Sequence, residues 1–338
     1  MKTSSLQIKP SQLSEVLKVM VPAGLPILVK GAPGVGKSDI ISQSVQSLGY
    51  DIIIEHPAVS DPTDYKGMPY VGNGHAEFLP FGSLRKIINA TKPTVYVMDD
   101  VGQAANSVQA ALMQLILARR VNGNRVADCV TFLAATNRHS DRAGVSGLLE
   151  PVKSRFAAIF ELITDLEDWT KWALQANLPA ELIAFIRFRP NFLHNFTPTN
   201  EIKNSPCPRT IANAGKLMAA GIPPSIEYQT FAGAAGEEFA AEFCGFLKIF
   251  RTLPNPDLVI ASPLTAEVPS DPATLYALCG ALSRRVKKEN IDNLVAYADR
   301  LPEEFSIMLI TDSANSNKEI IETSAYITWC SKHSTYMI

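Results

Sequence analysis

The stretch GAPGVGKS at positions 31–38 satisfies the pattern GxxxxGK[ST], and it lies between an apolar run and a stretch of helical character. In such a loop the glycines allow a tight turn that aims backbone N–H groups at phosphate oxygens, and the following helix adds its dipole. Lys37 would neutralise the β- and γ-phosphates, and the Ser38 hydroxyl would bind Mg²⁺. The stretch predicts a P-loop for ATP; a glycine-rich turn without a ligand is the weaker alternative. The candidate nucleotide-binding residues are those of the loop and the start of the next helix: Gly31, Ala32, Pro33, Gly34, Val35, Gly36, Lys37, Ser38, Asp39 and Ile40.

Short apolar runs alternate with helical stretches through the first half of the chain, which is typical of βαβ units and a parallel sheet. Each run is nearly continuous in apolar residues, as a strand buried on both faces should be. Before the first strand, we expect Ser11 to cap a helix whose apolar residues repeat at helical spacing. We therefore predict an α/β fold with a five-stranded parallel sheet. The candidate strands are Pro26–Lys30, Asp51–Glu55, Thr94–Met98, Val130–Ala135 and Ala158–Leu162.

Two insertions interrupt this alternation, and each is predicted to form a β-hairpin because an Asn-Gly pair stands between extended flanks. The first insertion covers residues 65–81, with its turn at Asn73-Gly74. The second covers residues 119–127, with its turn at Asn122-Gly123.

After about Thr164 the strand pattern ends, and helices separated by proline-rich joints are expected. The segment Leu253–Pro272 holds five prolines, so we predict an irregular strap there and not a helix. We expect two domains: a nucleotide-binding core over residues 1–163 and a helical region over residues 164–338. The candidate helices are Trp169–Gln175, Pro179–Phe188, Thr210–Ala220, Ser225–Phe250, Ala273–Lys288, Ile291–Arg300 and Lys318–Lys332.

Polar side chains follow the third and fourth candidate strands. Asp99 and Asp100 come directly after VYVM, and Asn137 follows AAT. At the carboxyl edge of a parallel sheet, Asp99 would hold Mg²⁺ through water, and Asp100 would orient the water that attacks the γ-phosphate. Asn137 would position that water, because we expect its strand between the strands that carry the P-loop and the two acids. Taken alone, an acid that caps the next helix and an ordinary turn asparagine remain open as alternatives.

Two arginines are candidates for contact with phosphate from outside this edge. Arg155, in the segment GLLEPVKSRF at 147–156, is expected at the end of a short helix, from which it could reach a neighbouring subunit's nucleotide as an arginine finger does. Lys153 is a rival for that task, and a surface salt bridge is the plain alternative. Arg209 follows Pro208 at the start of a helix, which would fix its direction; a solvated charge is the alternative there.

The composition excludes several classes of protein. The chain has 338 residues, 46% of them hydrophobic and 19% charged, which fits folded domains and neither disorder nor a fibrous repeat. A net charge of −2 lacks the basic excess of a dedicated nucleic-acid binder, although a local basic patch remains possible. Five dispersed cysteines fit neither a disulfide framework nor a zinc site. With no secretory signal and no apolar run of about 18 residues, we expect a cytoplasmic protein that does not enter a membrane.

The ordered motifs GAPGVGKS, VYVMDD, AATN, SRF and SPCPRT resemble those of the AAA+ ATPase superfamily, roughly over residues 10–220. The stretch DPTDYKGMPYVGNGHAEFLPFGSL resembles the helix-2 insertion of the MoxR branch. The resemblance implies a five-stranded αβα core with an all-helical lid, closed into a homo-oligomeric ring, usually a hexamer, with both hairpins at its pore. It also implies the roles of the matching residues: Lys37, Ser38 and Asp99 as ligands of ATP and magnesium, Asn137 as sensor 1, Arg155 as the finger, and Arg209 as sensor 2.

The resemblance implies an ATP-hydrolysing enzyme that remodels a protein client, as MoxR-like chaperones do beside a separate partner with a von Willebrand factor A domain. The chain departs from the AAA+ pattern at Asp100, where glutamate is usual, so slow hydrolysis or a nucleotide-gated scaffold is one alternative. A motor acting on nucleic acid is another, because Arg119, Arg120 and Arg125 surround the second hairpin. A P-loop kinase acting on a small molecule is a third.

Overall fold

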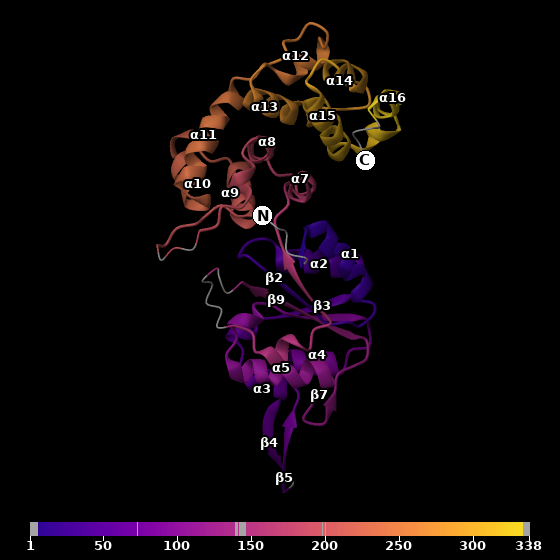
Figure 1. Cartoon of the computed structure of the whole chain (residues 1–338), viewed down its shortest axis with the longest axis vertical. Coiled ribbons are helices and arrows are strands. Elements are labelled where there is room, and N and C mark those ends of the chain that lie inside the picture. The colour runs from indigo at the N-terminus through magenta and orange to yellow at the C-terminus, as the bar shows by residue number, and fades with distance from the viewer. Residues whose placement is uncertain are drawn as a thin grey trace. The chain divides into compact units, whose positions relative to one another are not determined.

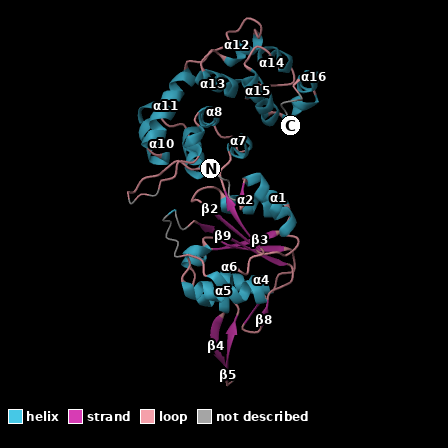
Figure 2. Cartoon of the chain, viewed as in Figure 1, coloured by secondary structure: helices cyan, strands magenta, loops and turns pink. Residues whose placement is uncertain are grey.

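The computed structural model describes residues 6–72, 74–138, 141, 147–197, 199 and 201–333. The chain divides into two compact units, Met1–Asp165 and Leu166–Ile338. The first unit contains the sheets, and the second consists of helices and loops over its described residues (Figure 2). No helix among the described residues has both the length and the apolar character needed to cross a membrane.

The central sheet of the first unit has six strands in the order β1-β10-β2-β9-β6-β3, and every neighbouring pair is parallel. Strands β2, β9 and β3 of this sheet are labelled in Figure 1. The predicted α/β class with a parallel sheet is confirmed. The predicted number of strands, five, is wrong, because the sheet has six. The strand that the sequence analysis missed, β1, has only two residues, which is too short to show an apolar pattern. The strands are β1 Gln7–Ile8, β2 Ile27–Gly31, β3 Asp51–Glu55, β6 Thr94–Met98, β9 Val130–Asn137 and β10 Ala158–Leu162.

Helices cover both faces of the sheet, and alternate residues of the five longer strands enter two different cores. Val29 of β2 packs with α1 (Pro10–Met20) and α2 (Lys37–Ser47). Leu28 belongs to the core on the other face. That second core contains side chains of α3 Pro62–Lys66, α4 Gly82–Ile88 and α5 Asn106–Ala118.

The start of α1 differs from the prediction. The helix begins at Pro10, and Lys9 occupies the N-cap position, so Ser11 lies inside the first turn and is not the N-cap residue. The Gln12 side chain accepts a hydrogen bond of 2.9 Å from the Lys9 backbone N–H. Proline at the first helical position explains the shift, because its fixed φ suits a helix start and its missing N–H costs nothing there.

Both insertions form antiparallel strand pairs. The first pair, β4 Met68–Gly72 with β5 His75–Leu79, projects away from the sheet (Figure 1). Asn73 lies outside the described residues. The second pair, β7 Arg120–Val121 with β8 Asn124–Arg125, turns at Asn122 (φ 47°) and Gly123 (φ 83°), the positive φ values that a tight hairpin turn requires.

The second unit contains ten α-helices in its described residues. They are α7 Leu166–Gln175, α8 Ala180–Phe188, α9 Pro208–Ala219, α10 Glu227–Ala235, α11 Glu237–Arg251, α12 Pro256–Ala261, α13 Pro272–Ser283, α14 Ile291–Ala298, α15 Glu303–Ser316 and α16 Ser324–Lys332.

The structure differs from the sequence expectations at several places in this unit. The single helix predicted over Ser225–Phe250 is broken at Gly236, whose φ of +98° no helix can hold. The proline-rich strap includes a helix, α12, because Asn255 accepts a hydrogen bond from the Asp257 N–H and Pro256 occupies the first position. Helix α15 was not predicted, since polar residues such as Ser313 are buried in it and obscure the apolar stripe.

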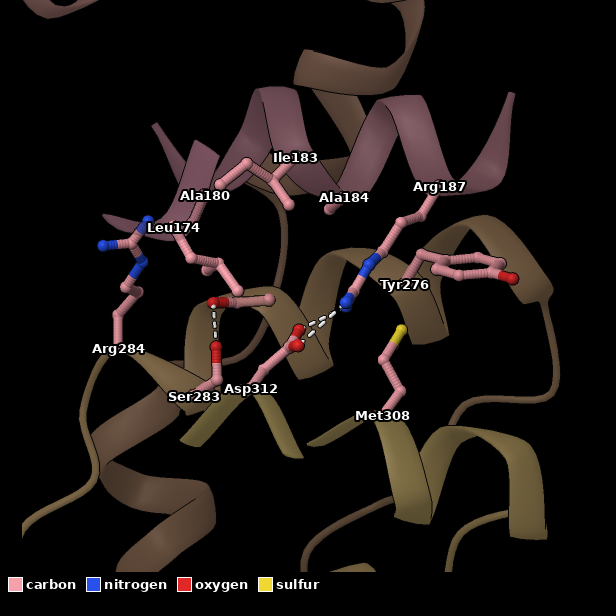
Figure 3. Close-up of a pocket in the computed structure, with 11 residues that line it drawn as sticks. Leu174, Ala180, Ile183, Ala184, Arg187, Tyr276, Ser283, Arg284, Met308 and Asp312 are labelled. Carbon is pink, nitrogen blue, oxygen red and sulfur yellow. Dashed lines mark hydrogen bonds and ion pairs between the residues drawn. The ribbon is translucent and has the colours of Figure 1, made fainter. Parts of the chain in front are cut away.

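A buried ion pair joins the two hydrophobic cores of the second unit. Arg187 of α8 donates two hydrogen bonds to the Asp312 carboxylate of α15, one of them 2.8 Å long from Nη2 to Oδ1 (Figure 3). The Asp312 side chain is only 4% exposed. Burial raises the pKa of the Asp312 carboxyl, and the charge and hydrogen bonds of Arg187 oppose that shift. The pair therefore orients α8 against α15 at a desolvation cost.

We expect Asp312→Leu to destabilise the second unit by about 3–5 kcal/mol, because it leaves the Arg187 charge buried and unpaired. The double variant Arg187→Met/Asp312→Leu should recover nearly all of that loss, because it removes both charges. Denaturant unfolding followed by tryptophan fluorescence measures this unit alone, since all three tryptophans (Trp169, Trp172 and Trp329) belong to it. A double variant as unstable as the single one would contradict the account.

Candidate functional site

The loop over residues 32–36 connects the end of β2 to the start of α2 at the carboxyl edge of the sheet. Gly36 is the N-cap of α2 with a φ of 94°, a value that favours glycine. Gly31 allows a close approach of strands, because a Cβ there would lie 2.9 Å from the Leu162 carbonyl oxygen of β10. The loop therefore has the tight turn and the helix N-terminus that phosphate binding requires.

Lys37 is turned into this edge. Its side chain is buried, and its Nζ donates hydrogen bonds of 3.0 Å to the carbonyl oxygens of Gly31 and Ala32. A third bond, 2.7 Å long, goes to Asn137 Oδ1. The register of the sheet explains the last contact, since Gly31 of β2 pairs with Asn137 of β9. The ammonium group is thus held inside the loop, at the carboxyl edge of the sheet.

Ser38 and Asp99 meet directly. The Ser38 hydroxyl donates a hydrogen bond of 2.6 Å to Asp99 Oδ2, although the two residues come from α2 and from the end of β6. Asp99 is 9% exposed, and its backbone N–H bonds to the Glu55 carbonyl oxygen at the end of β3. Both predicted magnesium ligands therefore lie at one point of the edge.

Asp100 contacts the amide nitrogen of Asn137, whose amide oxygen contacts Lys37. The Asn137 Nδ2 donates a hydrogen bond of 3.1 Å to Asp100 Oδ1, so one amide contacts both Lys37 and Asp100. Asp100 has a φ of 54°, which is uncommon for a residue other than glycine and turns the chain sharply after β6. Strand β9 lies between β2 and β6, as expected, which places Asn137 between the P-loop and the two acids.

The residues present fit a magnesium ion that is shared with a nucleotide. No group of three or more His, Cys, Asp or Glu side chains gathers in the described part of the chain to hold a metal. Mg²⁺ in phosphate-transfer sites needs no such group, because it keeps several waters and takes one or two protein oxygens plus phosphate oxygens. The Ser38 hydroxyl and the Asp99 carboxylate offer the two protein oxygens.

Comparison with known proteins agrees with this geometry. Residues 26–156 match the family model of an AAA domain (dynein-related subfamily). The matched segment contains the loop, Asp99, Asp100, Asn137 and Arg155. No curated protein matches the chain.

Solved structures include distant likenesses over most of the chain. The RuvB Holliday junction branch migration motor of Thermotoga maritima is 15% identical, with 80% of this chain and 81% of that chain covered and a TM-score of 0.41. NtrX from Brucella abortus in complex with ADP is 13% identical, with 96% and 67% covered and a TM-score of 0.42.

An ion-pair network beside Asn137 was missed from the sequence. Arg138 bonds to Asp141 at 2.9 Å and to Glu161 of β10 at 3.4 Å, and Glu161 also pairs with Lys30 of β2 at 3.2 Å. The hydrogen bond to Asp141 raises the pKa of Arg138. The network ties the end of β9 to β2 and β10. Strand register alone could have suggested part of it, because Glu161 and Lys30 are direct neighbours.

Arg155 does not join the cluster at the P-loop. Its Nε donates a hydrogen bond of 3.0 Å to the Met113 carbonyl oxygen of α5, and its Nη1 bonds to the Pro151 carbonyl oxygen. It follows the short helix α6 (Glu150–Lys153), as expected. Lys153 pairs on the surface with Glu150, which is 84% exposed, so the plain salt-bridge alternative fits Lys153.

Arg209 belongs to the second unit. It is exposed at the second position of α9, directly after Pro208, and makes no hydrogen bond or ion pair with any described residue. The helix start is held instead by Thr210, whose Oγ1 accepts a bond of 2.9 Å from the Cys207 N–H. The guanidinium is available for contact, and its role is a proposal.

Proposed function

We propose that this chain is an AAA+ ATPase of the MoxR-like branch, which binds and hydrolyses Mg·ATP and works as a homo-oligomeric ring. The observation that carries this proposal is the meeting of five side chains at one sheet edge: Lys37, Ser38, Asp99, Asp100 and Asn137. They come from three separate segments, and each has a distinct use in phosphoryl transfer to water.

In the proposed reaction, water attacks the γ-phosphorus of ATP, the bond to the bridging oxygen breaks, and ADP and inorganic phosphate leave. Lys37 exchanges its bonds to the Gly31 and Ala32 carbonyl oxygens for bonds to phosphate oxygens. Asp100 orients the water, and Asn137 keeps that carboxylate in place. Magnesium, held by Ser38 and Asp99, supplies positive charge that neutralises the phosphates when it is bound.

The arginines complete the proposed site from elsewhere. Arg155 contacts backbone oxygens of its own subunit in the structure and, in the proposal, reaches the γ-phosphate bound by the next subunit in the ring. Arg209 supplies a further charge from the helical lid. A hexamer is the ring size that the resemblance to the MoxR branch favours.

The hairpin β4–β5 supports the MoxR-like branch and its remodelling activity. It interrupts the chain between β3 and α4, where that branch carries its insertion, and it exposes apolar side chains such as Val71, which is 79% exposed. We propose that a protein client, in the cytoplasm, is engaged beside a separate partner with a von Willebrand factor A domain.

The nucleic-acid alternative loses part of its support. Two of the three arginines around the second hairpin are engaged: Arg119 donates bonds of 2.7 Å and 2.8 Å to backbone carbonyl oxygens, and Arg125 pairs with Asp128 at 2.6 Å. Only Arg120 is left exposed without a partner among the described residues. DNA-stimulated hydrolysis that weakens with salt would restore this alternative. A kinase would instead stay monomeric in sedimentation with ATP.

We expect Asp100→Asn to reduce steady-state ATP turnover by about 10²–10⁴-fold, with ATP affinity changed by less than about threefold. Asparagine keeps the size of the side chain and a carbonyl oxygen for Asn137, but its other polar group is an NH₂ donor, which cannot accept a hydrogen bond from the attacking water. Phosphate release and binding of a fluorescent ATP analogue measure the two quantities. Asp128→Asn, at an exposed acid of the same unit, is the control. Turnover as fast as the parent's would refute the role given to Asp100. If the parent itself barely hydrolyses ATP, the nucleotide-gated scaffold is favoured instead.

A further inference from the structure

Gln109 of α5 is a polar side chain with no exposed surface. Its Nε2 donates hydrogen bonds of 3.0 Å to the carbonyl oxygens of Ala104 and Gly147. Its Oε1 accepts a bond of 3.0 Å from the Leu149 N–H. The partners fix the orientation of the amide, because carbonyl oxygens only accept and an N–H only donates. The amide of Gln109 therefore makes three hydrogen bonds in the protein interior. These bonds offset the cost of burying it, since an unpaired amide there would be destabilising.

The partners of Gln109 belong to two segments that matter for the proposed site. Ala104 ends the turn that follows the acids: the Gln103 N–H bonds to the Asp100 carbonyl oxygen at 2.9 Å, and the Ala104 N–H bonds to that of Val101 at 3.3 Å. Gly147 and Leu149 lead directly into α6, with Leu149 as its N-cap. One side chain therefore ties the start of α6 to the turn that follows the acids.

The same helix α5 also holds the far end of α6. Arg155 bonds to the Met113 carbonyl oxygen, one helical turn beyond Gln109. Between these two attachment points, Val152 of α6 is fully buried in the core. The segment 147–155 is thus attached to α5 at both ends, and the position of the Arg155 guanidinium depends on both.

We propose that Gln109 is a positioning residue that holds α6 and thereby directs Arg155 toward the nucleotide of the neighbouring subunit. This inference rests on the proposed function, because it needs Arg155 to act between subunits. Gln109 itself does not touch the nucleotide. Without its three hydrogen bonds the start of α6 shifts, and a displacement of about 1 Å at a reacting group can reduce a rate about 100-fold.

The test is a double-mutant cycle on Gln109 and Arg155. Gln109→Met keeps the unbranched shape and the helix propensity but removes all three hydrogen bonds. We expect it to reduce single-turnover ATP hydrolysis by about 10–100-fold in the assembled protein, with ATP affinity unchanged. In an Arg155→Ala background the same change should have less than about a twofold effect, since the residue that it positions is gone.

Gln114→Leu is the matched control, because Gln114 is exposed on the same helix. This variant should leave hydrolysis unchanged in both backgrounds. If Gln109→Met lowers the melting temperature enough to lose the fold, Gln109→Asn enters the same cycle, since it keeps an amide one methylene shorter and buries no charge. Equal losses in both backgrounds, or no loss with Arg155 present, would overturn the inference. A parent-like rate for Arg155→Ala alone would instead overturn the proposed function.

Discussion

Replacing Arg155 by alanine is expected to reduce steady-state ATP turnover by about 10³-fold while each subunit still binds ATP with nearly its normal affinity. Within the described part of the chain this guanidinium bonds to the Met113 and Pro151 carbonyl oxygens of its own subunit, and the contacts of Lys37 at the P-loop do not include it. The variant should therefore lower the rate of hydrolysis, because the transition state at a subunit boundary loses a positive charge, and it should leave the affinity for ATP nearly unchanged.

Lys153→Ala is the decisive companion variant for Arg155→Ala. Lys153 lies two residues away and pairs with the exposed Glu150, so its removal should change turnover by less than about twofold. Turnover is followed by phosphate release, and assembly by sedimentation with ATP. If Lys153→Ala produced the large loss and Arg155→Ala did not, the finger would have been assigned to the wrong residue.

The second large effect is expected for Lys37→Ala, which should weaken ATP binding by about 100-fold or more and abolish measurable turnover. Lys37 is buried, and its ammonium group bonds to oxygens of Gly31, Ala32 and Asn137, so alanine removes a positive charge from inside the loop. The stability of the first unit should fall little, because the charge that leaves had been desolvated.

Binding of a fluorescent ATP analogue measures the effect of Lys37→Ala, and Lys18→Ala serves as the control. Lys18 is an exposed lysine in the last turn of α1. ATP affinity within a few-fold of the parent in Lys37→Ala would show that the loop over residues 31–38 does not bind the phosphates.

The sheet could be predicted from the sequence because its inner strands are buried on both faces and their apolar runs are continuous. Strand β1 has two residues at the sheet edge, which no pattern can reveal. The helical unit was harder to predict, because Gly236 breaks one long apolar pattern and buried polar residues such as Asp312 interrupt another. The helix boundary at Gly236 depends on backbone conformation, and the burial of Asp312 depends on its partner Arg187, which is distant in the chain.

The sequence predicts which candidate site residues stand at strand ends, but not the contacts between their side chains. Asp99, Asp100 and Asn137 stand at strand ends, so a parallel sheet brings them to one edge. The single amide of Asn137 that reaches both Lys37 and Asp100 depends on side-chain rotamers, which no sequence pattern contains. Gln109 gave no signal at all, because a glutamine in a helix is usually exposed and its three partners lie up to 40 positions away.

The most direct test of the central claim, that neighbouring subunits complete each other's site, is to mix the two inactive variants. A Lys37→Ala subunit keeps Arg155 but binds ATP weakly and does not turn it over, whereas an Arg155→Ala subunit binds ATP but lends no arginine. In randomly mixed rings with equal amounts of each, about a quarter of the boundaries pair an intact P-loop with an intact Arg155. We predict that the mixture recovers about that share of the parent turnover. A mixture that assembles and stays as inactive as its components at every ratio would contradict the account.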